Sequence, residues 1–325
     1  MDQLYQNLKQ FGQVKINEPL SKHTTFKIGG TADYFLIVER TSSLVSALQF
    51  LDGAGQEYFI LGGGSNMLVR DQGFRGVAVQ VRTKELNITD SGIVCDAGCT
   101  TVEVARKSIQ ANFVGFEWGV GVPGTIGGAV RGNAGAMNEE TKDCVEKVEV
   151  YENGEMVEYT NAECEFSYRS SRFKHKGGVV LRVWLALQKA EPGVSAQGMK
   201  KALEYLQYRN KTQPQGFSST GCVFKNVEVK DILVTAGPEE KERLLSLGVP
   251  EEFFTKGKIS AGWLVEHAGM KGAQVGQAKV SEVHGNFVVN MGQAHAQDVL
   301  NLVEEIKEKV YDRFHLKIEE EMQII

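Results

Sequence analysis

Hydrophobic residues along the chain change repeatedly between extended and helical spacing. Short apolar runs rich in β-branched residues predict strands at 34–38, 58–61, 77–81, 93–95, 145–151 and 179–187. Amphipathic spacing predicts helices over 3–11, 100–110, 197–209 and 298–314, and one more that Thr41 caps, with Leu44, Val45, Leu48 and Leu51 on one face. Strand, helix and strand follow in order across 34–61, which indicates a βαβ-like unit.

The region after residue 209 has a different character. The polar segment NKTQPQGFSSTG, residues 210–221, predicts a linker and a domain boundary. Residues 227–258 are interpreted as an insertion that contains a charged helix near 239–247. Ser260 then caps a helix that ends at Gly269. The apolar stripe of 298–314 is interpreted as core packing.

Composition limits the classes of function. A chain of 325 residues is long enough for two or three domains, and its net charge of −5 argues against a nucleic-acid-binding surface. The N-terminus lacks the pattern of a signal peptide, and no apolar run approaches the ~20 residues of a membrane span. Five cysteines occur without the Cys/His partners of a zinc site, so no metal is expected. We therefore expect a cytosolic chain with reduced thiols.

The glycine-rich segment, residues 119–136, reads GVGVPGTIGGAVRGNAGA and carries no charge apart from Arg131. Glycine and alanine bury little apolar area, so this segment cannot form a core of its own. Glycine does allow positive φ and close approach, which lets backbone N–H groups converge on an oxygen-rich ligand. An ordinary irregular loop is the alternative interpretation.

The glycine turn, residues 62–66, follows the strand at 58–61 and reads GGGSN. Strands that run into glycine turns are where phosphate-binding nests form. The sequence matches neither a Walker loop nor the GxGxxG dinucleotide fingerprint. Two glycine cradles in one chain favour a ligand with an extended diphosphate, such as a dinucleotide.

Seven motifs in order resemble one family. They are TTFKIGG (24–30), ILGGGSNMLV (60–69), GVPGTIGGAVRGNAGA (121–136), YRSSRF (168–173), GCVFKN (221–226), GMKGAQVGQAKVSEVHGNFVVN (269–290) and IEEEMQ (318–323). Together they are similar to the UDP-N-acetylenolpyruvoylglucosamine reductases over about residues 20–325. Seven ordered motifs are far more specific than any single one.

The resemblance implies an α+β fold of three domains, with FAD bound in the manner of the vanillyl-alcohol oxidase flavoproteins. On this basis we expect FAD-binding subdomains at 1–82 and 83–208 and a substrate-binding domain at 209–325. A return of the last residues to the first subdomain is left open. The family also implies NADPH as co-substrate and a monomer.

The resemblance places FAD against the two glycine segments. Because neither segment contains His or Cys, we expect the FAD to be noncovalent. The cofactor-binding residues implied are Leu61, Gly62, Gly63, Gly64, Ser65, Asn66, Met67, Pro123, Gly124, Thr125, Gly127, Gly128, Ala129, Asn133, Ala134 and Gly135.

The resemblance also implies the catalytic residues. Arg169, with Tyr168 beside it, takes the place of the arginine that polarises the substrate. Cys222 stands where the family usually has serine, and Glu321 matches the C-terminal acid. A thiol is a stronger acid than a hydroxyl, so Cys222 can serve as proton donor with Glu321 assisting. The other four cysteines are interpreted as small buried thiols.

Three further residues are substrate-contact candidates by motif position: Lys225, Asn226 and His284. A lone histidine is as readily a structural hydrogen-bonder, and that alternative stays open for His284. Val227 replaces the usual proline after Lys-Asn, and the spacing from Arg169 to Cys222 resembles the subgroup without an extra tyrosine loop.

The implied reaction is NADPH-dependent, FAD-mediated reduction of UDP-N-acetylglucosamine enolpyruvate to UDP-N-acetylmuramate in peptidoglycan precursor synthesis. Addition of hydride and a proton across one double bond needs a flavin, because no side chain supplies hydride. Two alternatives are an oxidase of small alcohols or hydroxy acids on the same flavin fold and a non-enzymatic nucleotide-binding regulator. The regulator would have lost the catalytic set, whereas Arg169, Cys222 and Glu321 are all present.

Overall fold

A computed structural model describes residues 2–191 and 194–325. The chain forms two compact units. Unit 1 contains the residues up to Pro19 and the ranges Thr31–Gly64 and Phe74–Lys211, and unit 2 contains Leu20–Gly30, Ser65–Gly73 and Thr212–Ile325. The N-terminal region therefore contributes to both units, which the sequence pattern did not indicate.

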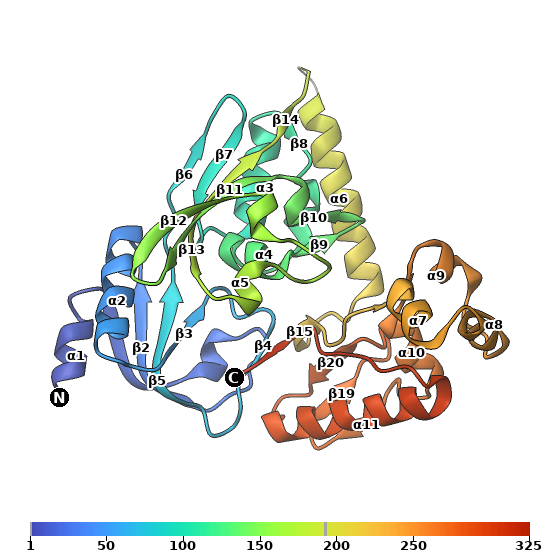
Figure 1. Ribbon diagram of the computed structural model, residues 1–325. Coiled ribbons are helices and arrows are strands. Elements are labelled where there is room, and N and C mark those ends of the chain that lie inside the picture. The colour runs from blue at the N-terminus through green and yellow to red at the C-terminus, as the bar shows by residue number, and fades with distance from the viewer. Residues whose placement is uncertain (1, 192–193) are drawn as a thin grey trace. The chain divides into compact units, whose positions relative to one another are not determined.

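The first sheet of unit 1 has the strand order β1-β2-β5-β3. Its strands are β1 (Gln13–Pro19), β2 (Thr31–Val38), β5 (Phe74–Val81) and β3 (Tyr58–Leu61), next to helices α1 (Gln3–Leu8) and α2 (Thr41–Gly53) (Figure 1). Both β2 and β3 run parallel to β5. The predicted βαβ-like unit is confirmed, but β5 lies between its two strands.

Helix α2 packs its predicted apolar face inward, since Leu44, Leu48 and Leu51 are fully buried. Its predicted cap is wrong. Arg40 occupies the N-cap position without a side-chain hydrogen bond, and Thr41 is the first helical residue. The Thr41 hydroxyl is buried and has no partner among the described residues. Burial of the apolar face therefore stabilises this helix without help from a capping side chain.

The second sheet of unit 1 is antiparallel, with the order β12-β11-β13-β7-β6. Its strands are β12 (Glu155–Thr160), β11 (Val145–Glu152), β13 (Val179–Ala186), β7 (Gly92–Asp96) and β6 (Leu86–Ile88). One hydrophobic cluster contains Leu36 and Val79 of the first sheet together with Val148 and Val183 of the second. A shared core explains why the two sheets form one unit.

Further helices, 3-10 turns and short strands complete the described part of unit 1. The helices are α3 (Thr101–Gln110), α4 (Ile126–Gly132), α5 (Arg172–His175) and α6 (Val194–Thr212), with 3-10 turns η2 (Glu117–Gly121), η3 (Thr141–Asp143) and η4 (Ala162–Cys164). The short strands are β8 (Phe113–Val114), β9 (Gly135–Ala136), β10 (Glu139–Glu140) and β14 (Gln188–Lys189). Thr100 caps α3 by accepting the N–H of Glu103.

Unit 2 is built on the sheet β15-β20-β19-β18. Its strands are β15 (Ser218–Cys222), β20 (Phe287–Asn290), β19 (Ala278–Val280) and β18 (Gln274–Val275), and its main helices are α10 (Ala261–His267) and α11 (Ala296–Phe314). The predicted stripe of α11 is confirmed as core, because Val299, Val303 and Ile306 are fully buried. Smaller elements are η1 (Leu20–His23), β4 (Met67–Leu68), β16 (Val227–Glu228), β17 (Lys258–Ile259) and β21 (Gln323–Ile324).

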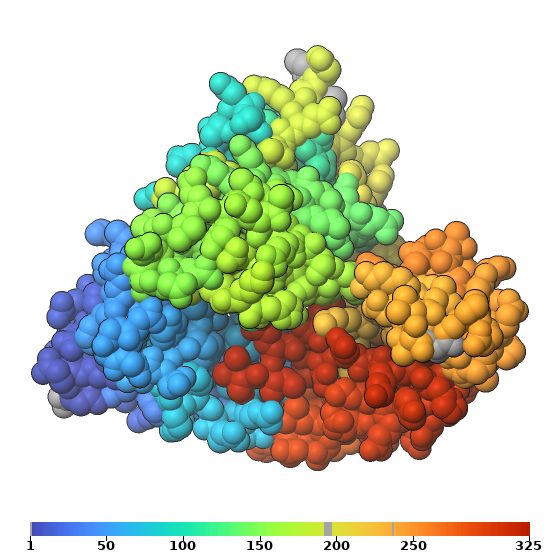
Figure 2. Space-filling view, in the orientation of Figure 1, coloured from blue at the N-terminus to red at the C-terminus, as the bar shows by residue number. Residues whose placement is uncertain are grey.

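The predicted insertion is mostly helical, with the short strands β16 and β17 at its ends. It forms α7 (Val229–Ala236), α8 (Glu239–Ser246) and α9 (Glu251–Thr255), of which α8 matches the predicted charged helix. In Figure 2 it forms the orange surface beside the red surface of α11. Phe253 packs edge-on against Trp263 with ring centroids 6.0 Å apart, and Trp263 lies 5.6 Å from Phe314. The insertion therefore extends the core of unit 2.

The predicted linker at 210–221 is shorter in the structure. Helix α6 continues to Thr212 and β15 begins at Ser218, so residues 213–217 connect the two elements. The backbone of the predicted range also makes a structural contact, because the hydroxyl of Thr25 donates to the carbonyl of Ser219. The chain nevertheless changes units at residue 212, close to the predicted boundary.

The last residues pair with β4, which lies within the predicted range 1–82. The division into three domains stays a prediction. Within the described residues, no helix has the length and apolar character to cross a bilayer.

Candidate functional site

The two glycine segments meet within unit 1. A Cβ on Gly63 would lie 2.9 Å from the Cα of Gly124, and a Cβ on Gly62 would lie 2.5 Å from the Oγ1 of Thr125. Gly64 and Gly124 both have positive φ, at 62° and 126°. Glycine is needed here because the backbones pack directly against one another. The structure thus places the two glycine segments against each other, and the binding of a dinucleotide to them stays a prediction.

Helix α4 begins in the centre of the glycine-rich segment. Thr125 is its N-cap and accepts the N–H of Gly128 at 3.4 Å. The N–H of Gly127 donates to Ala97, and a Cβ on Gly127 would lie 2.8 Å from the Cβ of Ala97. Packing against the turn after β7 explains this glycine. The predicted FAD contacts of Gly127 and Gly128 remain predictions, and their N–H groups already have protein partners.

Asn133 ends α4 in the left-handed conformation, with φ of 41°, and is completely buried. Its amide donates to Glu140 and to the carbonyl of Ser167, both at 2.9 Å, and its oxygen accepts the N–H of Lys142 at 3.0 Å. This side chain therefore ties the end of α4 to two neighbouring loops. The sequence predicted Asn133 as a cofactor-binding residue. The structure shows that it also holds neighbouring loops in place.

The loop that carries Arg169 is fastened to the same segment. Ser167 and Ser170 exchange backbone hydrogen bonds, which places Tyr168 and Arg169 in a tight turn, and Arg169 has φ of 54°. Its guanidinium donates to the carbonyl of Gly135 at 3.2 Å and lies over the ring of Tyr168. Non-glycine residues held at positive φ are concentrated at functional sites. The structure thus brings Arg169 to the glycine-rich segment.

Ser65, Asn66 and Met67, also predicted to contact FAD, belong to unit 2. The amide of Asn66 donates to the carbonyl of Glu321 at 3.1 Å, and the N–H of Gln323 donates to Asn66. Met67 pairs with Gln323 between β4 and β21. Asn66 therefore holds the backbone on which Glu321 lies.

Cys222 and Glu321 lie on paired segments of unit 2. The N–H of Glu321 donates to the carbonyl of Val223 at 2.7 Å, and Phe224 bridges to Glu320. Cys222 ends β15 and is half-buried, while the other four cysteines are buried, and all five are free thiols. Asn286, which the sequence analysis did not single out, holds the backbone of Phe224 with two hydrogen bonds of 2.8 Å: its side-chain oxygen accepts the N–H, and its amide donates to the carbonyl. Backbone pairing thus brings the predicted donor and the predicted acid together.

The three remaining candidates have structural partners in unit 2. Lys225 pairs with Glu319 at 2.9 Å, and Asn226 accepts the N–H of Ala261 at the start of α10. His284 accepts the N–H of Asn286 at Nδ1. Burial, and then the charge of Lys271, hold the pKa of His284 below its usual range, so the ring is neutral at pH 7. The structural role of His284 is observed; a substrate contact stays a prediction.

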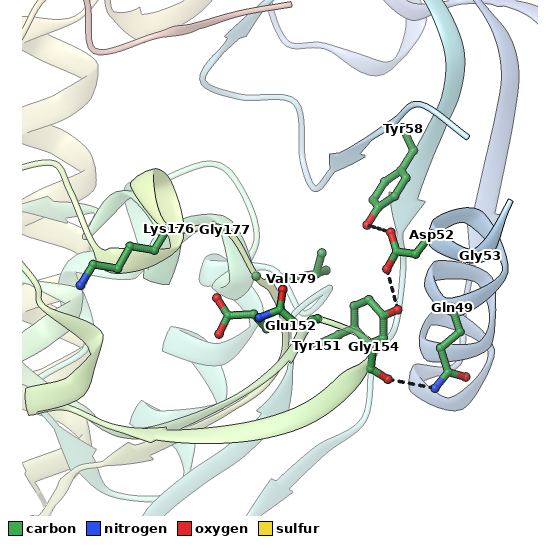
Figure 3. Close-up of a pocket in the computed structure, with 12 residues that line it drawn as sticks. Gln49, Asp52, Gly53, Tyr58, Tyr151, Glu152, Gly154, Lys176, Gly177 and Val179 are labelled. Atoms are coloured by element: carbon green, nitrogen blue, oxygen red, sulfur yellow. Dashed lines mark hydrogen bonds between the residues drawn. The ribbon is translucent and has the colours of Figure 1, made fainter. Parts of the chain in front are cut away.

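A polar cavity of about 590 Å³ lies elsewhere in unit 1, and none of the predicted site residues lines it. Figure 3 shows Asp52 between two tyrosines on its wall. Tyr58 donates to Asp52 at 3.0 Å and Tyr151 at 2.6 Å. Burial, followed by this hydrogen bond, raises the pKa of Tyr151 to about 12. Because Tyr58 is on β3 and Tyr151 on β11, their shared partner Asp52 links the two sheets of unit 1.

No group of three or more potential metal ligands occurs in the part of the chain that the structure describes.

Two family models match: an FAD binding domain over residues 32–160, and the UDP-N-acetylenolpyruvoylglucosamine reductase C-terminal domain over 213–325. A relative from Caldanaerobacter subterraneus that carries the name UDP-N-acetylenolpyruvoylglucosamine reductase is 36% identical to this chain. The match covers all of this chain and 97% of the relative's length. This chain belongs to the UDP-N-acetylenolpyruvoylglucosamine reductase family.

Further comparisons agree with membership in this reductase family. A relative of the same name from Alkaliphilus oremlandii is 35% identical over 96% of this chain and 93% of its own. The crystal structure of the reductase from Thermus caldophilus superimposes with a TM-score of 0.73 at 30% identity, covering 96% of this chain and 98% of that one. The expected α+β flavoprotein fold is thereby confirmed, and the chain is an FAD-dependent oxidoreductase.

Proposed function

We propose that this protein reduces the enolpyruvyl ether of UDP-N-acetylglucosamine to the lactyl ether, giving UDP-N-acetylmuramate for peptidoglycan synthesis, with NADPH as the electron donor. The observation that carries this proposal is the placement of the family's motif residues. Arg169 is fastened to the glycine-rich segment, and Cys222 and Glu321 lie on hydrogen-bonded segments. Full-length similarity to reductases of that name supports the same conclusion.

The contact of Gly63 with Gly124 is consistent with a flavin site, because a side chain on Gly63 would push the two glycine segments apart. Residues 62–64 and 123–125 would hold the diphosphate of FAD. Bound FAD supplies the hydride, which it accepts from NADPH. Since no cysteine or histidine occurs in either glycine segment, we infer that the FAD is noncovalent.

Arg169 would bind the substrate carboxylate and stabilise the negative charge that develops beside it when hydride adds to the β-carbon. Its strained backbone and its bond to Gly135 hold the guanidinium in place before substrate arrives. Preorganised charge of this kind stabilises a transition state without reorganisation at the moment of reaction.

Cys222 would give its thiol proton to the α-carbon, which completes the reduction. Glu321 would assist, and Asn66 and Val223 fix its backbone from both sides. Tyr168, Lys225, Asn226 and His284 would contact the substrate. We further propose that the enzyme acts as a monomer in the cytoplasm, where NADPH and UDP-sugars are available.

Colour and product test the proposal directly. The purified protein should be yellow, and NADPH should bleach it in the absence of oxygen. The enolpyruvyl substrate should then restore the colour and gain two hydrogen atoms, with one deuterium at the α-carbon when the solvent is deuterated water. A colourless protein that takes up no FAD would refute the proposal. Acid precipitation should release the flavin; flavin in the pellet would contradict noncovalent binding.

A further inference from the structure

Lys201 contacts both ends of the segment that forms the flavin cradle. Its Nζ lies 3.6 Å from a carboxylate oxygen of Glu117 and 3.0 Å from one of Glu139. Glu117 opens η2, just before the cradle, and Glu139 opens β10, just after it. One ammonium group therefore bridges the entrance and the exit of a 117–139 loop whose interior is mostly small residues.

The charges make this bridge costly to break. The side chain of Glu117 is only 3% exposed, and besides Lys201 it accepts the N–H of Gly115 at 2.9 Å. Burial alone lowers the pKa of Lys201, but the hydrogen bond to Glu139 and the charge of Glu117 outweigh it and hold that pKa above its usual range. Lys201 is thus charged at any physiological pH, and its loss leaves Glu117 buried without a cation.

Helix α6, which carries Lys201, lies directly against the loop. A Cβ on Gly121 would lie 2.6 Å from the Cδ of Arg209, so the helix approaches the loop where a side chain is missing. Near the other end of α6, Gly198 also lies next to Glu117, and a Cβ there would be at an ordinary contact distance of 3.8 Å from its Oε1. The helix is therefore a rigid support, and Lys201 is its charged attachment.

The far end of the loop leads to the catalytic arginine. Glu139 pairs with Ala136, and Glu140 with Gly135, between β9 and β10. Gly135 in turn accepts the hydrogen bond of Arg169. Movement of this hairpin would therefore displace cradle residues and the arginine together.

We propose that Lys201 is a positioning residue that sets how tightly this protein holds its flavin, because it ties both ends of the 117–139 loop to α6. The inference rests on the proposed function, in which this loop binds FAD. Lys201 needs no contact with FAD to act in this way. Because Lys201 already restrains the glycine-rich loop, the loop loses less conformational entropy when the cofactor binds.

The test measures flavin affinity in Lys201→Met, with Lys200→Met as the matched control. Lys200 is the neighbouring, exposed lysine of the same helix. Titration of apo-protein, followed by FAD fluorescence, should give a Kd raised about tenfold in Lys201→Met, because the partly exposed ammonium moderates the cost of the lost pair. Lys200→Met should match the parent, and Lys201→Arg should restore most of the affinity.

A second measurement separates positioning from general stability. The melting temperature of the apo-protein should fall in Lys201→Met, because Glu117 stays buried without its cation. Separately, the increase in melting temperature that FAD produces should be smaller than in the parent. An unchanged Kd would overturn the inference. If Lys201→Met does not fold, Glu139→Gln provides the test, since it keeps the Glu117 pair and should raise the Kd severalfold; parent affinity there would equally overturn it. Failure of the parent protein to bind FAD would instead refute the proposed function.

Discussion

Replacement of Asn133 tests whether one buried amide holds the loop of Tyr168 and Arg169 against the glycine-rich segment. In Asn133→Gly the backbone can keep its left-handed φ of 41°, while all three side-chain hydrogen bonds disappear. A buried neutral bond contributes about 1 kcal/mol and a bond to a charged group about 2, so the bonds to Ser167, Lys142 and Glu140 together contribute about 4 kcal/mol. Asn133→Ala should lose about 1 kcal/mol more, because alanine resists the left-handed conformation.

Urea denaturation of the apo-protein measures both losses through the fluorescence of Trp118 and Trp184, which belong to unit 1. Asn153→Gly is the matched control. Asn153 has φ of 54° in an exposed hairpin, so it shares the backbone conformation of Asn133 without its burial. Its replacement should change the free energy of unfolding by no more than about 0.5 kcal/mol.

The same variant has a kinetic consequence. Loss of the bond to Ser167 frees one side of the Tyr168–Arg169 turn, so oxidation of the reduced enzyme by the enolpyruvyl substrate should slow more than its reduction by NADPH. If Asn133→Gly unfolds within about 0.5 kcal/mol of the parent, the hydrogen bonds contribute nothing of note and the reasoning is refuted.

Three other changes follow from the structure. Arg169→Lys keeps the charge but loses the two-pronged geometry, so stopped-flow absorbance should show normal reduction by NADPH and substrate-dependent reoxidation slowed by orders of magnitude; equal slowing of both would assign Arg169 to folding or flavin binding. Cys222→Ser should keep substantial activity, Cys222→Ala should not, and iodoacetamide should inactivate the parent unless substrate protects it; an active Cys222→Ala would shift the donor role to Glu321. Burial, and then the hydrogen bond to Asp52, raise the pKa of Tyr151 to about 12 from an ordinary 10.0 on folding, so the stability that the neutral phenol contributes should be fully present below pH 10 and should be lost as pH rises to 12. Tyr151→Phe should flatten this alkaline loss in unfolding experiments; an identical pH profile would contradict the coupling.

The sequence by itself determined the local elements and the chemistry. Strand β3, the stripe of α11 and the cap of α10 by Ser260 were predictable, because hydrophobic period and capping residues act within a few positions of the chain. The ordered motifs also identified the cofactor and the reaction class. The limits of the linker at 210–221 were less predictable. Its residues resemble a loop locally, but contacts that fix them, such as the bond from Thr25 to the carbonyl of Ser219, come from residues distant in sequence.

Only the tertiary structure decided how distant segments combine. It joined Gly63 to Gly124, bonded Arg169 to Gly135 and paired Glu321 with Val223, contacts between residues separated by tens of positions. It also gave Asn133 three partners and Lys201 two, and neither set follows any local pattern. Backbone groups and buried charges must be satisfied by whatever the fold brings near, and a one-dimensional pattern does not contain that proximity.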